Sequence, residues 1–226
     1  SHANLKNDLV SAGHTTAAGR AISYVSPIGV VKELTEGIDY YKYLELINND
    51  FDNQYDKLVD DLKTVLGEIL WRNGLEISYT SDCEPENVLK ASVTNLSKRL
   101  SSRLSYENAK KISPCAYNEG FKTASQVQYV ATAGNFMERG LTYNGGLSVL
   151  SSIFSYDYLW INVRVKGGAY GCMCAFARSG NAYFTSYRDP NLMETYDIYK
   201  KAPEYVRSFD ADERDMTKYI IGAISK

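Results

Sequence analysis

The sequence predicts an α+β fold built from two αβ modules. Three observations support this prediction. Apolar residues recur with a helical period between residues 52 and 70, and they alternate with a period of two in residues 75–80, 170–177 and 182–187. A polar stretch of weak periodicity, residues 101–120, separates the two sets of elements. At 226 residues, the chain is long enough for two such modules.

Helices dominate the first module. Apolar spacing from Ile22 onward, with a break around Pro27 to Gly29, predicts a pair of helices. Residues 52–70 carry their apolar side chains opposite charged ones, as an amphipathic helix does. Asn73 and Gly74 end this helix, and the alternation in residues 75–80 predicts a strand. A further helix is expected after residues 82–85, running to Leu100.

The second module mixes strands and helices. Residues 126–132 alternate well enough for a strand, and residues 144–165 have helical spacing. The chain then turns at Gly167 and Gly168. The two alternating segments that follow, 170–177 and 182–187, are joined by residues that favour a hairpin.

Two more helices are expected near the end of the sequence. Asn191 and Glu194 have the spacing of a capping box and would begin a helix over residues 192–206, which Pro203 would kink or end. Another helix is predicted over residues 212–225. Arg188 and Asp189, just before the first of these helices, are interpreted as parts of a turn rather than as a catalytic ion pair.

The segment from Arg164 to Tyr170 is the strongest candidate for a functional site. Its two glycines can take up a positive φ and allow close approach of another backbone, so the loop can bring a guanidinium and a phenol to one edge of a sheet. Both groups can donate hydrogen bonds to a carbonyl oxygen or a developing oxyanion. The structural alternatives are a helix-end cation for Arg164 and a packed strand aromatic for Tyr170.

Metal ligands and nucleophile motifs are missing from the sequence. Its only histidines, His2 and His14, lie twelve positions apart and outside any H-x-x-E-H or H-E-x-x-H pattern. Cys172 and Cys174 do not form a C-x-x-C knuckle and are expected to be buried thiols. No G-x-S-x-G elbow and no phosphate-binding glycine motif is present. We therefore predict no metal site and no cofactor site within this sequence.

Composition narrows the classes of function. A net charge of −2 with interspersed charges argues against nucleic-acid binding, and no apolar run approaches the roughly 18 residues of a membrane span. Four cysteines without a secretory signal favour reduced thiols, so a cytoplasmic location is predicted.

Several motifs in a fixed order carry a family resemblance. The R-x-x-G-G-x-Y spacing, SYRDPNL after it, and NEGFKTASQVQYVATAGNF and YNGGLSVLSSIF before it resemble the C-terminal half of pitrilysin-type, or insulinase-like, zinc metallopeptidases. The similarity is greatest to the presequence-protease branch. It covers most of residues 105–226, with a weaker helical match over about residues 12–104.

The resemblance implies a fold, a domain layout and a division of roles. Mostly antiparallel sheets packed by helices would form two modules: residues 1–104, the C-terminal part of a third pitrilysin-like domain and incomplete, and residues 105–226, a fourth such domain shortened at its C-terminus. Zinc would be held by an N-terminal half outside this sequence. Arg164 and Tyr170 would reach it across a closed chamber, binding a peptide substrate and stabilising the oxyanion. This portion alone would be inactive.

Two interpretations of function stay open at this point. The first is the non-zinc portion of a peptide-degrading metallopeptidase, and the alternative is a non-catalytic peptide-binding or assembly subunit of the same fold. A targeting signal in a missing N-terminal part would change the location to an organellar matrix or to the outside of the cell.

Overall fold

A computed structural model of the chain describes residues 2–80, 86–100, 102, 111–123 and 126–225. The chain divides into two compact units: residues up to Glu45 together with those from Ile112 onward form one, and residues 46–111 form the other. The predicted module boundary between residues 104 and 105 lies outside the described residues, so it stays a prediction.

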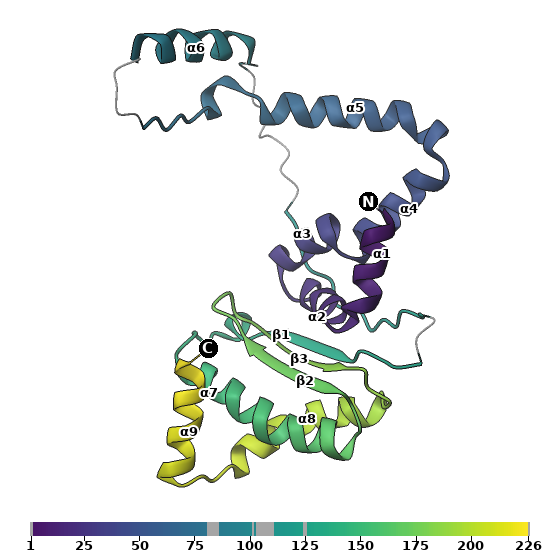
Figure 1. Cartoon of the computed structure of the whole chain (residues 1–226), viewed down its shortest axis with the longest axis vertical. Coiled ribbons are helices and arrows are strands. Elements are labelled where there is room, and N and C mark those ends of the chain that lie inside the picture. Colours follow the sequence, from purple (N-terminus) through teal and green to yellow (C-terminus); the bar gives the residue numbers. More distant parts are fainter. Residues whose placement is uncertain (1, 81–85, 101, 103–110, 124–125, 226) are drawn as a thin grey trace. The chain divides into compact units, whose positions relative to one another are not determined.

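The described residues are mostly helical with one small antiparallel sheet, which confirms the predicted α+β class (Figure 1). The elements in chain order are α1 (His2–Ser11), α2 (Gly13–Ser23), α3 (Pro27–Glu36), α4 (Ile38–Asn49), α5 (Phe51–Ile69), η1 (Arg72–Gly74), α6 (Glu86–Arg99), β1 (Ala131–Asn135), η2 (Met137–Arg139), α7 (Gly146–Ile153), η3 (Phe154–Tyr158), η4 (Trp160–Lys166), β2 (Gly171–Phe176), β3 (Asn181–Tyr187), α8 (Met193–Ser208) and α9 (Glu213–Ile224). None of the helices in the described ranges is both long and apolar enough to cross a membrane.

The sheet of the larger unit has the strand order β1-β3-β2. β2 and β3 form the predicted hairpin, with Gly171 opposite Tyr187 and Phe176 opposite Ala182. Gly180 closes the hairpin at a φ of 86°, in the left-handed region that glycine tolerates. β1 pairs antiparallel with the other side of β3, from Ala131 opposite Thr185 to Asn135 opposite Asn181.

One face of this sheet holds the hydrophobic core. Three helical segments and helix α8 lie along that face (Figure 1). The three segments are α7 and its π-helical continuation, η3 and η4. Leu159 and Val163 on the continued helix are fully buried, and Cys174 of β2 packs into the same cluster. Cys172 lies two residues earlier and packs against the cluster as well, but it is only half-buried, so the predicted buried thiol is confirmed for Cys174 and not for Cys172.

The opposite face of the sheet is covered by α2, which packs against β1 and β3 (Figure 1). The approach is close at Gly13, where a Cβ would lie 2.3 Å from the ring of Tyr129. Only glycine fits there without a shift of that ring. The hydroxyl of Thr185 donates to the carbonyl oxygen of His14 over 3.3 Å, which joins the first turn of α2 to the centre of the sheet.

The smaller unit contains the long amphipathic helix α5 and helix α6. Both were predicted, α5 within one residue of its observed bounds. The strand expected at residues 75–80 is wrong, because these residues are irregular and mostly exposed. Alternation alone does not make a strand, since a strand also needs a partner to satisfy its backbone groups.

Two boundaries differ from their predictions in the larger unit. The first strand covers residues 131–135 rather than 126–132, because the described residues before it form no continuous ladder: Gln128 pairs with Asp189 in an isolated bridge. Helix α8 continues through Pro203 to Ser208, so the proline does not end it. The break predicted around Pro27 is confirmed: α2 ends at Ser23, and α3 begins at Pro27 with Ser26 as its N-cap.

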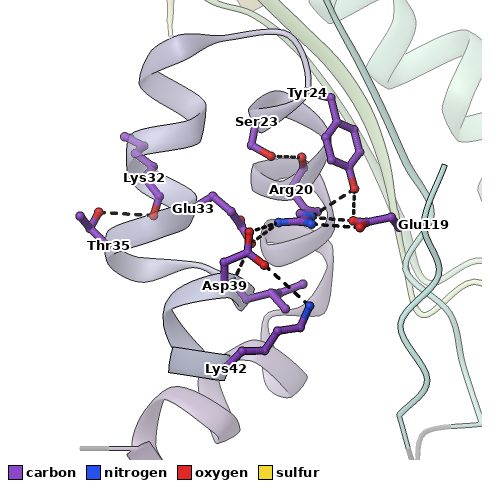
Figure 2. Close-up of polar contacts among 10 residues, drawn as sticks. Arg20, Ser23, Tyr24, Lys32, Glu33, Thr35, Asp39, Lys42 and Glu119 are labelled. Atoms are coloured by element: carbon purple, nitrogen blue, oxygen red, sulfur yellow. Dashed lines mark hydrogen bonds and ion pairs between the residues drawn. The ribbon is translucent and has the colours of Figure 1, made fainter. Parts of the chain in front are cut away.

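A half-buried arginine joins the N-terminal helices to the segment after residue 111 (Figure 2). Arg20 of α2 contacts Glu33 at 2.9 Å and Asp39 at 2.7 Å, and it binds both carboxylate oxygens of Glu119 at 2.7 and 3.0 Å. Tyr24 donates its hydroxyl to the same Glu119 carboxylate. Such bidentate, charge-assisted bonds are short and directional, so the network fixes how these segments meet.

Glu33 belongs to this network and also caps the next helix. Its carboxylate, which is 5% exposed as a residue, accepts the backbone N–H groups of Ile38 and Asp39 at 2.9 and 3.1 Å. These are the first amides of α4, where a negative charge is favoured by the helix dipole. Arg20 and the two amides together compensate a carboxylate that burial would otherwise penalise.

The network makes stability depend on pH. The hydrogen bond from Arg20 lowers the pKa of the Glu119 carboxyl from its ordinary 4.5 to about 2. Between those values the unfolded chain binds more protons than the folded one, so stability rises with pH across this window and is lost as pH falls through about 2. We expect Glu119→Gln to flatten the rise in unfolding free energy between about pH 2 and pH 4.5, measured by urea denaturation.

The exposed Glu138 provides the matched control for this experiment. Glu138→Gln should leave the slope of stability against pH as it is in the parent protein. Equal slopes for the parent and the Glu119→Gln variant would contradict the role given to Glu119.

Candidate active site

The segment from Arg164 to Tyr170 leaves the end of one helix and enters the edge strand β2. Gly168 stands at a φ of 80°, and its N–H donates to the carbonyl oxygen of Arg164 over 2.9 Å. A Cβ on Gly167 would lie 2.6 Å from the carbonyl oxygen of Val163. Both glycines are therefore required, one for its conformation and one for close approach, as the sequence predicted.

Arg164 is half-buried at the edge of the core, because the neighbouring side of its helix packs into that core. Leu159 and Val163, four residues apart, are buried there at 0% exposure. Trp160 and Arg164 are also four residues apart, and each directly follows one of these buried residues. They therefore lie together on the adjacent side of the helix. The guanidinium carbon of Arg164 lies 3.9 Å from the centre of the Trp160 ring, and this stacking holds the cation in place.

The structure brings the two predicted site residues together. The guanidinium carbon of Arg164 lies 5.9 Å from the ring centre of Tyr170, and Tyr170 is 67% exposed. The backbone N–H of Tyr170 donates to the carbonyl oxygens of Tyr187 at 3.0 Å and Arg188 at 3.3 Å, which pins the residue to the end of β3. A phenol held in this way can donate a hydrogen bond outward to a ligand.

The turn after β3 is organised by a buried carboxylate. Asp189 is 0% exposed, and its two oxygens accept the backbone N–H of Asn191 at 2.9 Å and the hydroxyl of Thr195 at 2.8 Å. Its backbone exchanges two 2.9 Å hydrogen bonds with Gln128. The side chain of Asn191 donates over 2.5 Å to the carbonyl oxygen of Gly167. The SYRDPN turn therefore holds the glycine loop that carries Tyr170.

These contacts correct one prediction and support another. Asn191 is not the N-cap of α8: the cap position is Leu192, without a side-chain cap bond, and the amide of Asn191 reaches the glycine loop instead. The capping box with Glu194 is therefore wrong. Asp189 is structural, as predicted from the sequence, although it acts as a buried acceptor and not through a simple turn.

Aromatic rings extend the site beyond the two predicted residues. The ring of Tyr187 lies 5.7 Å from that of Tyr170, edge to face, and 4.9 Å from the ring of His14. Tyr129 lies 5.7 Å from Tyr187 on the same side. Sequence reasoning missed Trp160 and Tyr187. Trp160 could have been found because it lies four residues before Arg164, and Tyr187 because it directly precedes Arg188.

The described residues do not fit a zinc site. They contain no group of three or more His, Cys, Asp or Glu side chains placed to hold a metal ion. His14 packs against tyrosines, and burial lowers its pKa. Burial raises the pKa of the Cys172 thiol to about 11, which keeps it protonated and a poor ligand. Cys83 lies outside the described residues.

Comparison with known proteins identifies the family. The family model described as "PreP C-terminal domain" matches residues 118–226, and a second model, of a peptidase-associated region, matches residues 1–47. The chain is 32% identical over 99% of its length to "Presequence protease 1, chloroplastic/mitochondrial" of Arabidopsis thaliana. The chain belongs to the presequence-protease family. The resemblance to the C-terminal half of pitrilysin-type metallopeptidases, inferred from its motifs, is thereby confirmed.

Other relatives align over the same extent. The chain is 40% identical over 99% of its length to "Protein HypA" of Clostridium perfringens and 25% identical over 93% to "Presequence protease, mitochondrial" of Saccharomyces cerevisiae. It covers 23%, 21% and 23% of the HypA, Arabidopsis and yeast proteins, so it spans less than a quarter of the length of these relatives.

The buried acceptor in the SYRDPN turn should contribute measurably to stability. Asp189→Ala leaves the N–H of Asn191 and the hydroxyl of Thr195 without their acceptor, which costs about 1–3 kcal/mol of unfolding free energy. Asp197→Ala, an exposed carboxylate 3.6 Å from Lys200 on α8, is the control and should change stability by less than about 0.5 kcal/mol. Similar losses in urea denaturation for the two variants would refute the role of Asp189.

Proposed function

We propose that this chain is the non-zinc, C-terminal portion of a peptide-degrading metallopeptidase of the presequence-protease type. In the assembled enzyme it contributes Arg164 and Tyr170 to substrate binding and oxyanion stabilisation within a closed chamber. The observation that carries the proposal is the convergence of these two side chains at the start of β2, with Arg164 on the helix and Tyr170 after the loop that two glycines and the SYRDPN turn hold in place.

Tyr170 is the proposed electrophilic residue. Its hydroxyl donates a hydrogen bond to the carbonyl oxygen of the scissile peptide, and the bond strengthens as negative charge develops on that oxygen. Because its backbone is pinned to the end of β3, the donor needs little reorganisation when the reaction occurs. Arg164, stacked on Trp160 and beside the ring of Tyr170, orients the phenol or the substrate backbone.

The remaining components come from outside this chain. The zinc ligands of the full-length protein must come from its N-terminal half, because the described residues here do not form a zinc site. That half is therefore the proposed partner, and a peptide is the proposed substrate. The two-module layout, residues 1–104 and 105–226, and the cytoplasmic location stay predictions.

The division between two portions can be tested by reconstitution. The isolated chain should not cleave an unstructured peptide, whereas a mixture with the N-terminal portion should, and a chelator should abolish that activity. Cleavage by the isolated chain with bound zinc in a one-to-one ratio would overturn the proposal. The alternative, a non-catalytic subunit, predicts that the mixture is inactive too.

The role of the phenol can be tested in the full-length protein. Tyr170→Phe keeps the ring contacts but removes the donor, so kcat should fall by about 100- to 1,000-fold. Tyr43→Phe on α4, where the tyrosine is 47% exposed, is the matched control and should leave kcat unchanged. A Tyr170→Phe enzyme with normal kcat would exclude Tyr170 as the oxyanion donor.

A further inference from the structure

Two arginines flank the candidate site, and its proposed mechanism uses only one of them. Arg164 lies over Tyr170, with its guanidinium carbon 5.9 Å from the ring centre, and Arg188 lies over Tyr187 at 5.5 Å. The two tyrosine rings contact each other at 5.7 Å. These four side chains therefore form a row of successive contacts on the surface where β2 begins and β3 ends.

The backbone of Arg188 is unusual. It is the one residue other than glycine with a positive φ, 48°, in the described part of the chain. Successive side chains of a strand point to opposite faces, so an extended Arg188 would point away from Tyr187. The left-handed conformation breaks this alternation, and the guanidinium lies over the Tyr187 ring.

Nothing local makes this conformation easy for an arginine, which has a Cβ, so the surroundings must impose it. They do so on both sides. The carbonyl oxygen of Arg188 accepts the backbone N–H of Tyr170 at 3.3 Å, and the next residue, Asp189, is paired with Gln128 and buried. The turn thus holds Arg188 in a strained conformation beside the candidate catalytic residue, a combination found at binding sites.

The charges of this surface are uncompensated. Among the described residues, neither Arg164 nor Arg188 forms an ion pair with a carboxylate, whereas Arg20 contacts three. Guanidinium groups bind carboxylates through paired hydrogen bonds and remain charged at every physiological pH. Stacking on the rings leaves the N–H edges of both groups available to a ligand.

We propose that Arg188, together with Arg164, binds a carboxylate of the peptide substrate beside Tyr170. This inference rests on the proposed function and names the chemical class of substrate that the site prefers. The carboxylate comes either from the C-terminus of the peptide or from an Asp or Glu side chain near the scissile bond. Arg188 determines specificity in this scheme, while Tyr170 carries the chemistry.

The test uses the full-length protein and three peptides of one sequence. The first peptide is uncharged at both tested positions, because it has Gln near the scissile bond and an amidated C-terminus. The second has a free C-terminal carboxylate in place of the amide. The third has Glu in place of Gln. Arg188→Gln should lower kcat/KM by about tenfold or more, mainly through KM, for whichever charged peptide supplies the ligand. The same substitution should leave kcat/KM for the neutral peptide unchanged.

Control variants separate charge recognition from a change of fold. Arg178→Gln removes another exposed arginine, one that lies 5.8 Å from the ring of Tyr143, and should not alter the preference. Arg188→Gly suits the left-handed backbone better than arginine does, so it should keep the fold and still lose the preference. Equal effects of Arg188→Gln on all three peptides, or no effect on any of them, would overturn the proposal.

A binding measurement distinguishes failure of this inference from failure of the proposed function. Fluorescence anisotropy of the labelled peptides with the chelated, inactive enzyme should show weaker binding of the charged peptide to the Arg188→Gln variant. Loss of the preference in this variant supports the inference even if Tyr170→Phe retains full kcat. Unchanged affinity for both charged peptides refutes it, whatever the result for Tyr170.

Discussion

The geometry of the candidate site depends on one buried carboxylate. Asp189 is completely enclosed, yet each of its oxygens has a donor, one from the backbone of Asn191 and one from the hydroxyl of Thr195. A buried charge is tolerated only when such bonds satisfy it, and an unsatisfied one would be costly. The turn is therefore held in a single conformation. From it, Asn191 reaches Gly167, so one carboxylate determines the path of two loops whose bonded residues are 24 positions apart in the sequence.

Two arginines of this chain have different roles, because only one of them is paired with carboxylates. Arg20 is surrounded by three carboxylates, and its hydrogen bonds, chiefly to Glu119, raise its pKa. A cation so completely paired has little left to offer a ligand, but it orders helices α2, α3 and α4 against the segment that carries Glu119. Arg164 is instead positioned by an aromatic ring, which orients the guanidinium without neutralising it. The first arrangement stabilises the fold, and the second keeps a charge available for binding.

The sequence predicted best where one local signal is sufficient. The amphipathic period of α5, the hairpin of β2 and β3, and the glycine turn after Arg164 were predicted because each depends on neighbouring residues. Residues 75–80 alternate like a strand but lack a sheet, and Asn191 has capping spacing but bonds to Gly167 instead. Both errors concern partners that are remote in sequence. The two-glycine segment predicted the pairing of Arg164 with Tyr170, whereas the supporting rings of Trp160 and Tyr187 were missed, although both lie at informative positions in the sequence.

The spacing between the guanidinium and the phenol is determined by the backbone rather than by direct contact. The guanidinium carbon of Arg164 lies 5.9 Å from the ring centre of Tyr170, a contact that can orient the phenol but does not fix the backbone of either residue. Arg164 is positioned by buried Leu159 and Val163 on its helix, and Tyr170 by its bonds to the end of β3. The glycine loop joins these two rigid supports. Because each group is held independently, a ligand can enter between them without first breaking a bond that joins them, as a site for an extended peptide requires.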